Sequence, residues 1–202
     1  EEKEKKDRER REVVAAEAKI LSLLALTKMV GPRGIKEFDL SLFNPNFDSN
    51  EAYKSCLNFN PEKENLFIWG PAGVGKTHLA AGVMRNFLLS GVPSIFIKHA
   101  VLNRSMQGLK SDEYDKKLAE YSIASVLVVD DLGTAKRTEF SDQVLYEVLD
   151  GRYMAFRNGM IITSNLSLSE LATTLGDDRL VSRIAGMCKV INLKGQDYRI
   201  KK

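Results

Sequence analysis

The segment WGPAGVGKTHLA, residues 69–80, combines glycines, a lysine and a hydroxyl group in a spacing that suits phosphate binding. It fits the pattern G-x-x-x-x-G-K-[ST], which begins here at Gly70 and ends at Thr77. Glycines let successive backbone N–H groups turn toward one anion, and a helix beginning at Lys76 points the positive end of its dipole at the same place. The Lys76 ammonium can reach the β- and γ-phosphates of a nucleotide, while the Thr77 hydroxyl suits Mg²⁺. The predicted nucleotide-binding residues are Gly70, Pro71, Ala72, Gly73, Val74, Gly75, Lys76, Thr77 and His78.

Polar side chains also stand at the ends of two apolar runs. In VLVVDDLG, residues 126–133, apolar residues deliver Asp130 to the carboxyl end of a strand, where α/β sheets bind ligands. We expect Asp130 to hold Mg²⁺ through its water shell and Asp131 to orient the attacking water; the alternative for Asp131 is that it caps the following turn. Asn165, in IITSN, closes another strand, either as a turn-former or as a second contact to that water. The candidate catalytic residues are thus Lys76, Asp131 and Asn165, and the candidate Mg²⁺ ligands are Thr77 and Asp130.

Short apolar runs alternate with helical patterns along residues 35–202, which we expect to form one domain. This alternation predicts an α/β fold with a parallel sheet covered by helices on both faces. The expected strands are 66–69, 95–98, 126–130, 160–163 and 189–193. The expected helices are a short one starting near Ser49, then 76–90, 101–110, 115–121 and 141–156, with helical turns over 169–187.

Residues 1–34 are expected to form a separate N-terminal part, a charged and amphipathic helix followed by a linker. The first 12 residues are all charged, six of each sign, and apolar residues then recur at roughly helical spacing up to Val30. The sequence Gly31-Pro32-Arg33-Gly34 stops the helix. Two interpretations remain open: a solvated helix with one face packed on the domain, or an arm that binds a partner.

The composition restricts the class of protein. A chain of 202 residues with 44% hydrophobic and 28% charged residues is typical of a globular protein. Its net charge is only +3, so contact with nucleic acid would have to come from a local basic patch. Two separate cysteines and two histidines make a zinc site implausible. The sequence shows neither a membrane span nor a secretory signal, so we expect a cytoplasmic protein without membrane contact.

The motifs GVGKTHLA, VVDDLG and IITSN occur in this order, followed by GDDRLVSRIAGMCKVINLKGQDYR at residues 176–199. With them the chain resembles the AAA+ ATPases of the initiator clade over residues 36–199. It is most similar to the DnaC/DnaI-type bacterial helicase loaders and to their relatives, the IstB-type transposition ATPases. The resemblance implies an AAA+ P-loop NTPase core with a five-stranded parallel sheet, and the short stretch after the last strand implies no C-terminal lid domain.

The resemblance also implies that ATP and Mg²⁺ bind between neighbouring subunits of a ring or spiral. An arginine finger would then be supplied in trans, and Arg183 occupies the matching position. Arg179 stands one helical turn earlier on the same face and is a further candidate nucleotide contact. Many AAA+ proteins carry Glu where this chain has Asp131, which is one methylene shorter. We interpret this departure as a sign of a slow, switch-like ATPase.

A helicase loader of this kind would bind a replicative DnaB-type helicase and single-stranded DNA. Two stretches match the places from which such loaders contact DNA. Residues 101–110 offer Arg104 and Lys110. Residues 133–140 offer a basic pair, a hydroxyl and an aromatic ring, which suit phosphate contact and base stacking: Lys136, Arg137, Thr138 and Phe140. The alternative is a solvated loop with Phe140 turned into the core.

Two other functions compete with the helicase-loader interpretation. An IstB-type transposition ATPase would share every motif but would bind duplex DNA and a transposase. A P-loop kinase or small GTPase would also carry the phosphate loop. The chain lacks the Asn-Lys-x-Asp sequence that specifies guanine in GTPases and offers no acceptor-binding lid after the second strand. The motifs therefore favour an ATPase of the initiator clade.

Overall fold

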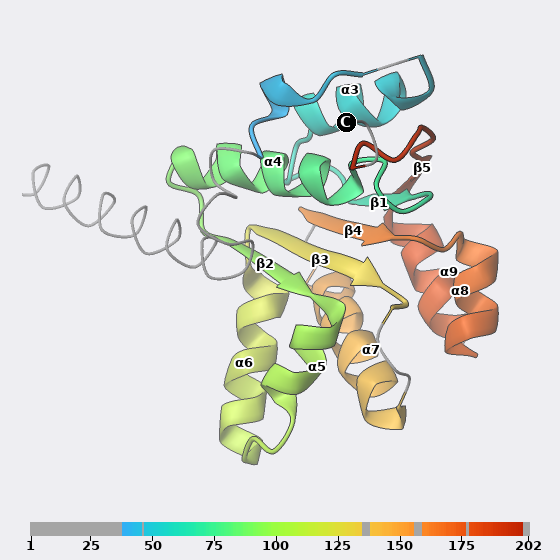
Figure 1. The fold of residues 1–202 in the computed structure, drawn as a ribbon. Coiled ribbons are helices and arrows are strands. Elements are labelled where there is room, and N and C mark those ends of the chain that lie inside the picture. Colours follow the sequence, from blue (N-terminus) through green and yellow to red (C-terminus); the bar gives the residue numbers. More distant parts are fainter. Residues whose placement is uncertain (1–37, 46, 135–137, 156–158, 177, 200–202) are drawn as a thin grey trace, which may run out of the picture.

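The computed structural model of the chain describes residues 38–45, 47–134, 138–155, 159–176 and 178–199. The predicted N-terminal helix and linker, residues 1–34, lie outside these ranges. The described residues form an α/β fold around one five-stranded parallel sheet (Figure 1), as the sequence predicts.

The strand order of the sheet is β2-β3-β4-β1-β5. The strands are β1 (Leu66–Trp69), β2 (Ser94–Lys98), β3 (Val126–Leu132), β4 (Met160–Ser164) and β5 (Lys189–Asn192). All four neighbouring pairs run parallel. The carboxyl ends of the strands therefore meet at one edge, and β4, which follows β3 in the sheet, also borders β1, which leads into the glycine-rich loop.

Helices cover both faces of the sheet, with α3 and α4 on one side and α5, α6 and α7 on the other (Figure 1). The helices are α3 (Asn50–Leu57), α4 (Lys76–Leu89), α5 (His99–Met106), α6 (Ser111–Ile123), α7 (Glu139–Met154), α8 (Leu168–Leu175) and α9 (Asp178–Met187). Short 3-10 helices at Leu40–Leu42 and Phe47–Ser49 precede α3. After β5 the described chain continues as an irregular segment to residue 199.

Alternating side chains of strands β1 to β4 belong to different hydrophobic cores. In β1, Leu66 and Ile68 pack with α4 residues such as Leu79, whereas Phe67 packs on the opposite face with α7 residues such as Leu145. All five of these side chains are fully buried. A parallel sheet with both faces covered requires strands that are apolar at nearly every position, which is what the sequence shows.

The strands and helices predicted after residue 38 all occur, and their ends differ by a few residues. Helix α5 begins at His99 and ends at Met106, earlier than the predicted 101–110. Helix α6 is longer than the predicted 115–121 at both ends, and the predicted turns over 169–187 are two helices, α8 and α9. None of the described helices is both long and apolar enough to cross a membrane.

Helix α7 is fixed to the end of α6 by a buried arginine. Arg152 is fully buried, and its Nη1 donates hydrogen bonds to the carbonyl oxygens of Tyr121 at 3.1 Å, Ser122 at 3.4 Å and Ala124 at 2.9 Å. The guanidinium thus satisfies carbonyl groups that the end of a helix leaves without an intrahelical partner. This anchor fixes α7, whose other face meets α9.

Candidate functional site

The glycine-rich loop connects β1 to the first residue of α4. Its backbone takes positive φ at Gly73 (78°) and Gly75 (100°), and Gly75 forms the N-cap of α4 in a left-handed conformation. A Cβ added at Gly75 would lie 2.7 Å from Cε2 of Phe43, so no larger residue fits without displacement of that ring. Because α4 begins directly after this turn, its free N–H groups face the loop, which is the geometry of an anion site.

Lys76 brings a positive charge into the loop. Its side chain is buried, and Nζ donates hydrogen bonds to the carbonyl oxygens of Gly70 at 2.8 Å and Pro71 at 2.6 Å. Burial lowers the pKa of Lys76, whereas the carboxylates of Asp131 and Asp130 act in the opposite direction. A buried ammonium that faces neutral carbonyl oxygens is strongly stabilised by an added anion, so the loop fits a phosphate group.

A network of two hydroxyl groups joins α4, β3 and β4 at the carboxyl edge of the sheet. Asp130 Oδ1 accepts hydrogen bonds from Thr77 Oγ1 at 2.8 Å and from Thr163 Oγ1 at 2.6 Å. Thr163 Oγ1 in turn accepts a hydrogen bond from the backbone N–H of Asp131 at 3.0 Å. The structure therefore brings the two predicted Mg²⁺ ligands, Thr77 and Asp130, into direct contact.

The second oxygen of Asp130 is left for a ligand. Asp130 is fully buried, and its Oδ2 has no hydrogen-bond partner among the described residues. Burial raises the pKa of Asp130, and the hydrogen bonds from Thr163 and Thr77 oppose that effect. An unpaired buried carboxylate oxygen is costly, and hard cations such as Mg²⁺ prefer carboxylate and hydroxyl oxygens. The donor set of Asp130 and Thr77 fits such an ion.

Asp131 has an unusual backbone conformation. Its φ of 58° is the only positive value among the non-glycine residues that the structure describes. The pairing of β3 with β4 shifts in register between Val129 and Leu132, so Asp131 lies in the irregular part of the strand. A left-handed conformation at such a residue costs about 1–3 kcal/mol and is typical of functional sites. The geometry fits the role that we predict for Asp131 beside Asp130, and this role stays a prediction.

Asn165 lies directly beside the start of the loop. It follows Ser164, which pairs with Trp69 across β4 and β1, and the N–H of Gly70 donates to the Ser164 carbonyl at 3.2 Å. Its side chain is exposed. The register of the sheet therefore places Asn165 at the edge that carries the loop, and its contact with a water molecule stays a prediction.

His78 and the C-terminal segment pack around the loop. His78 Nε2 lies 3.1 Å from the Asp39 carbonyl oxygen, and its ring centroid lies 5.8 Å from that of Phe43, so the ring faces the segment before α3. The backbone N–H of Tyr198 donates to the Gly73 carbonyl at 3.1 Å, and its hydroxyl donates to the Asn44 carbonyl at 3.3 Å. The contacts of Tyr198 and Phe43 with the loop were not predicted from the sequence.

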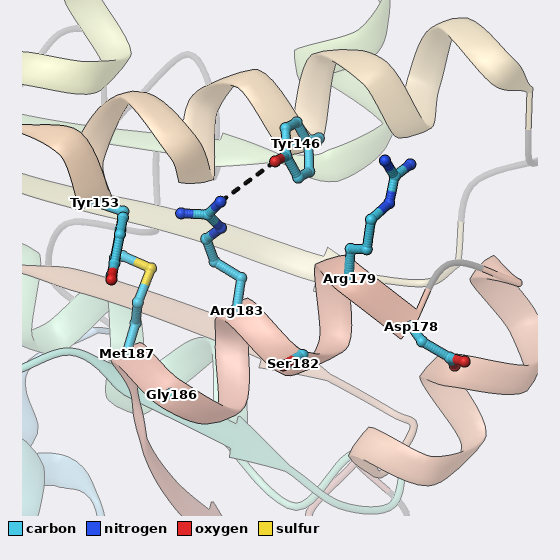
Figure 2. Close-up of a pocket in the computed structure, with 8 residues that line it drawn as sticks. All are labelled: Tyr146, Tyr153, Asp178, Arg179, Ser182, Arg183, Gly186 and Met187. Carbon is cyan, nitrogen blue, oxygen red and sulfur yellow. Dashed lines mark hydrogen bonds between the residues drawn. The ribbon is translucent and has the colours of Figure 1, made fainter.

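Arg179 and Arg183 extend from α9 toward α7 (Figure 2). They line a hollow of about 690 Å³ together with Tyr146, Tyr153, Asp178, Ser182, Gly186 and Met187. The carbon at the centre of each guanidinium lies over the ring of Tyr146, at 5.6 Å for Arg179 and 5.5 Å for Arg183. The two arginines thus share one face of α9, as their spacing predicts, while the contact of Arg183 with a neighbouring subunit stays a prediction.

The residues proposed for DNA contact are only partly described. Arg104 and Lys110 are exposed at α5 and at the start of α6, whereas Lys136 and Arg137 lie outside the described residues. The Thr138 hydroxyl accepts a hydrogen bond from Ser141 N and caps α7. Phe140 is half-buried and packs against the hydrophobic core, which agrees with the alternative of a ring turned inward.

Comparison with known proteins finds relatives that are described as ATP-binding proteins. The family model described as IstB-like ATP binding protein matches residues 2–202 of the chain. An ATP-binding protein of insertion sequence IS5376 from Geobacillus stearothermophilus is 30% identical over 197 residues, which are 94% of this chain and 77% of that protein. An ATP-binding protein of insertion sequence IS21 from Pseudomonas aeruginosa is 26% identical over 186 residues, 89% of this chain and 69% of that protein.

Among solved structures, the crystal structure of the DnaC helicase loader is similar, with a TM-score of 0.68 and 28% identity. The similarity covers 81% of this chain and 99% of the DnaC chain. The fold prediction of an AAA+ core is confirmed by this comparison.

The hydroxyl of Thr163 gives a testable prediction about the buried carboxylate. Thr163→Val removes both the donor to Asp130 and the acceptor for the Asp131 N–H, and we expect it to lower the free energy of unfolding by about 1–3 kcal/mol at neutral pH. Loss of the hydroxyl raises the pKa of Asp130 further above its ordinary value of 3.8. Asp130 then binds its proton more tightly in the folded state than in the unfolded state. The free energy of unfolding therefore falls as the pH rises from the unfolded-state pKa of Asp130 to its folded-state pKa.

The difference between Thr163→Val and Thr163→Ser should therefore be smaller in acid, where Asp130 is protonated in both states, than at neutral pH. Urea denaturation of both variants in acid and at neutral pH gives the difference between their free energies of unfolding. A difference that does not change with pH would show that Thr163 does not act on the Asp130 carboxylate.

Proposed function

The chain belongs to the IstB-like ATP-binding protein family, and we propose that it is an ATPase that serves the transposition of an insertion sequence. The observation that carries this proposal is the network of Thr77, Asp130 and Thr163 beside the phosphate loop, with Asp130 Oδ2 left for a cation. The descriptions of the relatives as ATP-binding proteins of insertion sequences support the role in transposition. In this role the protein binds duplex DNA and a transposase.

The residues of the loop and of the neighbouring strand ends have different roles in the proposed ATP hydrolysis. Lys76 holds the β- and γ-phosphates, and Thr77 and Asp130 hold Mg²⁺, which neutralises charge on the phosphates. Asp131 orients the attacking water, and Asn165 contacts the same water from the neighbouring strand. The contacts of Asp131 with Thr163 and its position in the irregular part of β3 support this assignment.

We propose that the catalytic site is shared between subunits of a ring or spiral. Arg183 lies on α9, after the last strand-to-helix connection, and has no role in the hydrogen-bonded network around Asp130. As an arginine finger it would stabilise the charge on the γ-phosphate bound by the neighbouring subunit. The hollow beside it, lined by residues of α7 and α9, gives the side chain room to move.

A second candidate function is that of a helicase loader. The similarity to the DnaC loader, at 28% identity over 99% of that chain, supports it. In this role the protein would bind a DnaB-type replicative helicase and single-stranded DNA. The resemblance of the motifs also favours this function, but the descriptions of the relatives as proteins of insertion sequences favour the transposition ATPase.

Binding of ATP and its hydrolysis should depend on different residues. Lys76→Ala removes the direct cation partner of the phosphates and should abolish ATP affinity in isothermal titration calorimetry. Asp131→Ala should leave ATP bound while the rate of phosphate release falls. Lys54→Ala, which removes an exposed lysine from α3, serves as the control for the change in charge. Equal loss of ATP binding in Asp131→Ala and Lys76→Ala would show that Asp131 is structural.

A shared site predicts that two inactive variants complement each other. Arg183→Ala should bind ATP normally and hydrolyse it roughly a thousandfold more slowly, in line with arginine fingers in other systems. Mixing it with Lys76→Ala should restore part of the activity, since one variant supplies the nucleotide site and the other supplies the arginine. If no mixing ratio restores hydrolysis, the site is not shared.

DNA binding separates the two candidate functions. Fluorescence anisotropy with duplex and single-stranded DNA of equal length should show a preference for the duplex if the protein serves transposition, and for the single strand if it is a helicase loader. With a net charge of +3, affinity must depend on a few aligned cations, so it should fall as salt rises. Lys136→Ala combined with Arg137→Ala should lower both the affinity and the dependence on salt.

The control for this double variant removes two exposed lysines elsewhere, Lys54→Ala with Lys116→Ala. An equal loss of affinity in both double variants would mean that DNA binding depends on overall charge and not on residues 136–137.

A further inference from the structure

Arg183 is held against its own chain by a carboxylate on α7. Its Nη2 lies 2.7 Å from Asp150 Oδ1. The same nitrogen donates a hydrogen bond to the Tyr146 hydroxyl at 3.2 Å (Figure 2). The Arg183 side chain is only 22% exposed. The guanidinium therefore lies along the surface of α7 and does not extend away from the molecule.

Two tyrosine rings of α7 also contact this guanidinium. The central carbon of Arg183 lies 4.6 Å from the ring centroid of Tyr153 and 5.5 Å from that of Tyr146. Arg179 lies over the Tyr146 ring as well, at 5.6 Å. Attraction between a cation and an aromatic face adds to the ion pair, so Arg183 has three favourable contacts on α7 of its own chain.

These contacts compete with the role of an arginine finger. A guanidinium that stabilises the γ-phosphate of a neighbouring subunit must direct its N–H donors at that phosphate. In the observed position Nη2 is already directed at the Asp150 carboxylate, and the positive charge is already compensated. Contact with the neighbour thus requires that Arg183 leave Asp150.

We propose that Asp150, Tyr146 and Tyr153 form a latch that stores Arg183 against α7 until a neighbouring subunit presents its bound nucleotide. This inference rests on the proposed function, in which Arg183 acts in trans. Asp150 is a positioning residue here, since it acts on hydrolysis through Arg183. The latch makes the engagement of Arg183 depend on a neighbour whose bound nucleotide competes with Asp150, and so links hydrolysis to correct assembly.

The latch is weak enough to open. The side chains of Arg183 and Asp150 are 22% and 36% exposed, and ion pairs with such access to solvent contribute little to stability. A triphosphate carries more negative charge than one carboxylate and accepts two parallel hydrogen bonds from a guanidinium. The hollow of about 690 Å³ beside Arg183 leaves space for the side chain to swing.

The experiment compares variants that open the latch with variants that preserve it. Asp150→Asn keeps the shape of the side chain and removes the charge, whereas Asp150→Glu keeps the charge. Tyr153→Leu removes the ring 4.6 Å from Arg183, and Tyr153→Phe keeps it. Glu120→Gln, which breaks the exposed pair with Lys117 on α6, is the matched control for loss of one carboxylate and one ion pair. Because Tyr153 is 54% exposed, its substitution tests the latch even if Asp150→Asn impairs folding.

The first readout does not depend on ATP hydrolysis. Phenylglyoxal modifies arginines, and mass spectrometry of the digested protein gives the rate for Arg183 relative to exposed Arg104 in the same sample. We expect this rate to rise about two- to fivefold in Asp150→Asn and Tyr153→Leu, as for loss of a partly exposed ion pair, and to stay unchanged in Asp150→Glu, Tyr153→Phe and Glu120→Gln. Unchanged modification of Arg183 in both opening variants would overturn the latch.

The second readout is hydrolysis in trans. Asp150→Asn or Tyr153→Leu is combined with Lys76→Ala in one protein, which cannot bind ATP but keeps Arg183. This protein is mixed with Arg183→Ala subunits, which bind ATP but lack the arginine. At protein concentrations too low to saturate assembly, we expect hydrolysis about two- to fivefold faster than with the Lys76→Ala single variant. Faster modification with unchanged or slower hydrolysis would overturn the latch and show that the α7 contacts orient Arg183. If Lys76→Ala alone restores no hydrolysis, the shared site itself fails, and the latch fails with it whatever the modification rates show.

Discussion

The arrangement of the candidate site depends on one buried carboxylate. Asp130 is fully buried at the carboxyl edge of the sheet, where an unpaired negative charge would strongly destabilise the fold. Hydrogen bonds from Thr77 at the start of α4 and from Thr163 in β4 compensate part of that charge. The acceptor in β3 and its two donors, in α4 and β4, thus link three elements at the edge that carries the phosphate loop. The other oxygen of Asp130, Oδ2, has no hydrogen-bond partner among the described residues and fits a cation.

The irregular part of β3 lies next to this carboxylate. The register of β3 against β4 shifts between Val129 and Leu132, and Asp131 takes a left-handed φ of 58° there, a conformation that Asp tolerates better than most side chains. The Thr163 hydroxyl accepts a hydrogen bond from the Asp131 N–H. One threonine thus contacts both the carboxylate of Asp130 and the backbone N–H of Asp131, which couples the candidate ion site to the position of the adjacent acid.

Local patterns in the sequence were sufficient to predict the phosphate loop, the order of strands and helices along the chain, and the assignment of Thr77 and Asp130 to one site. They were not sufficient for Thr163, since a threonine inside a β-strand is common and nothing in IITSN distinguishes its hydroxyl from that of any other strand residue. Nor could they predict Tyr146 and Asp150 beside Arg183, because that contact depends on how α7 packs on α9. The choice between helicase loader and transposition ATPase was also beyond the motifs, since both classes need the same residues around ATP.

The phosphate loop and Arg183, the two parts of the proposed shared site, are held in different ways. The loop side is fixed by buried hydrogen bonds, and its residues have little freedom once the sheet has formed. Arg183 is held by partly exposed contacts between α7 and α9, none of which is strong by itself. A rigid cradle suits the binding of the same phosphates in every cycle, whereas weak contacts suit a group that must change partners. Arg152 belongs to the fixed part, since its buried guanidinium joins α7 to the end of α6, whereas the contacts of α7 with Arg183 are partly exposed.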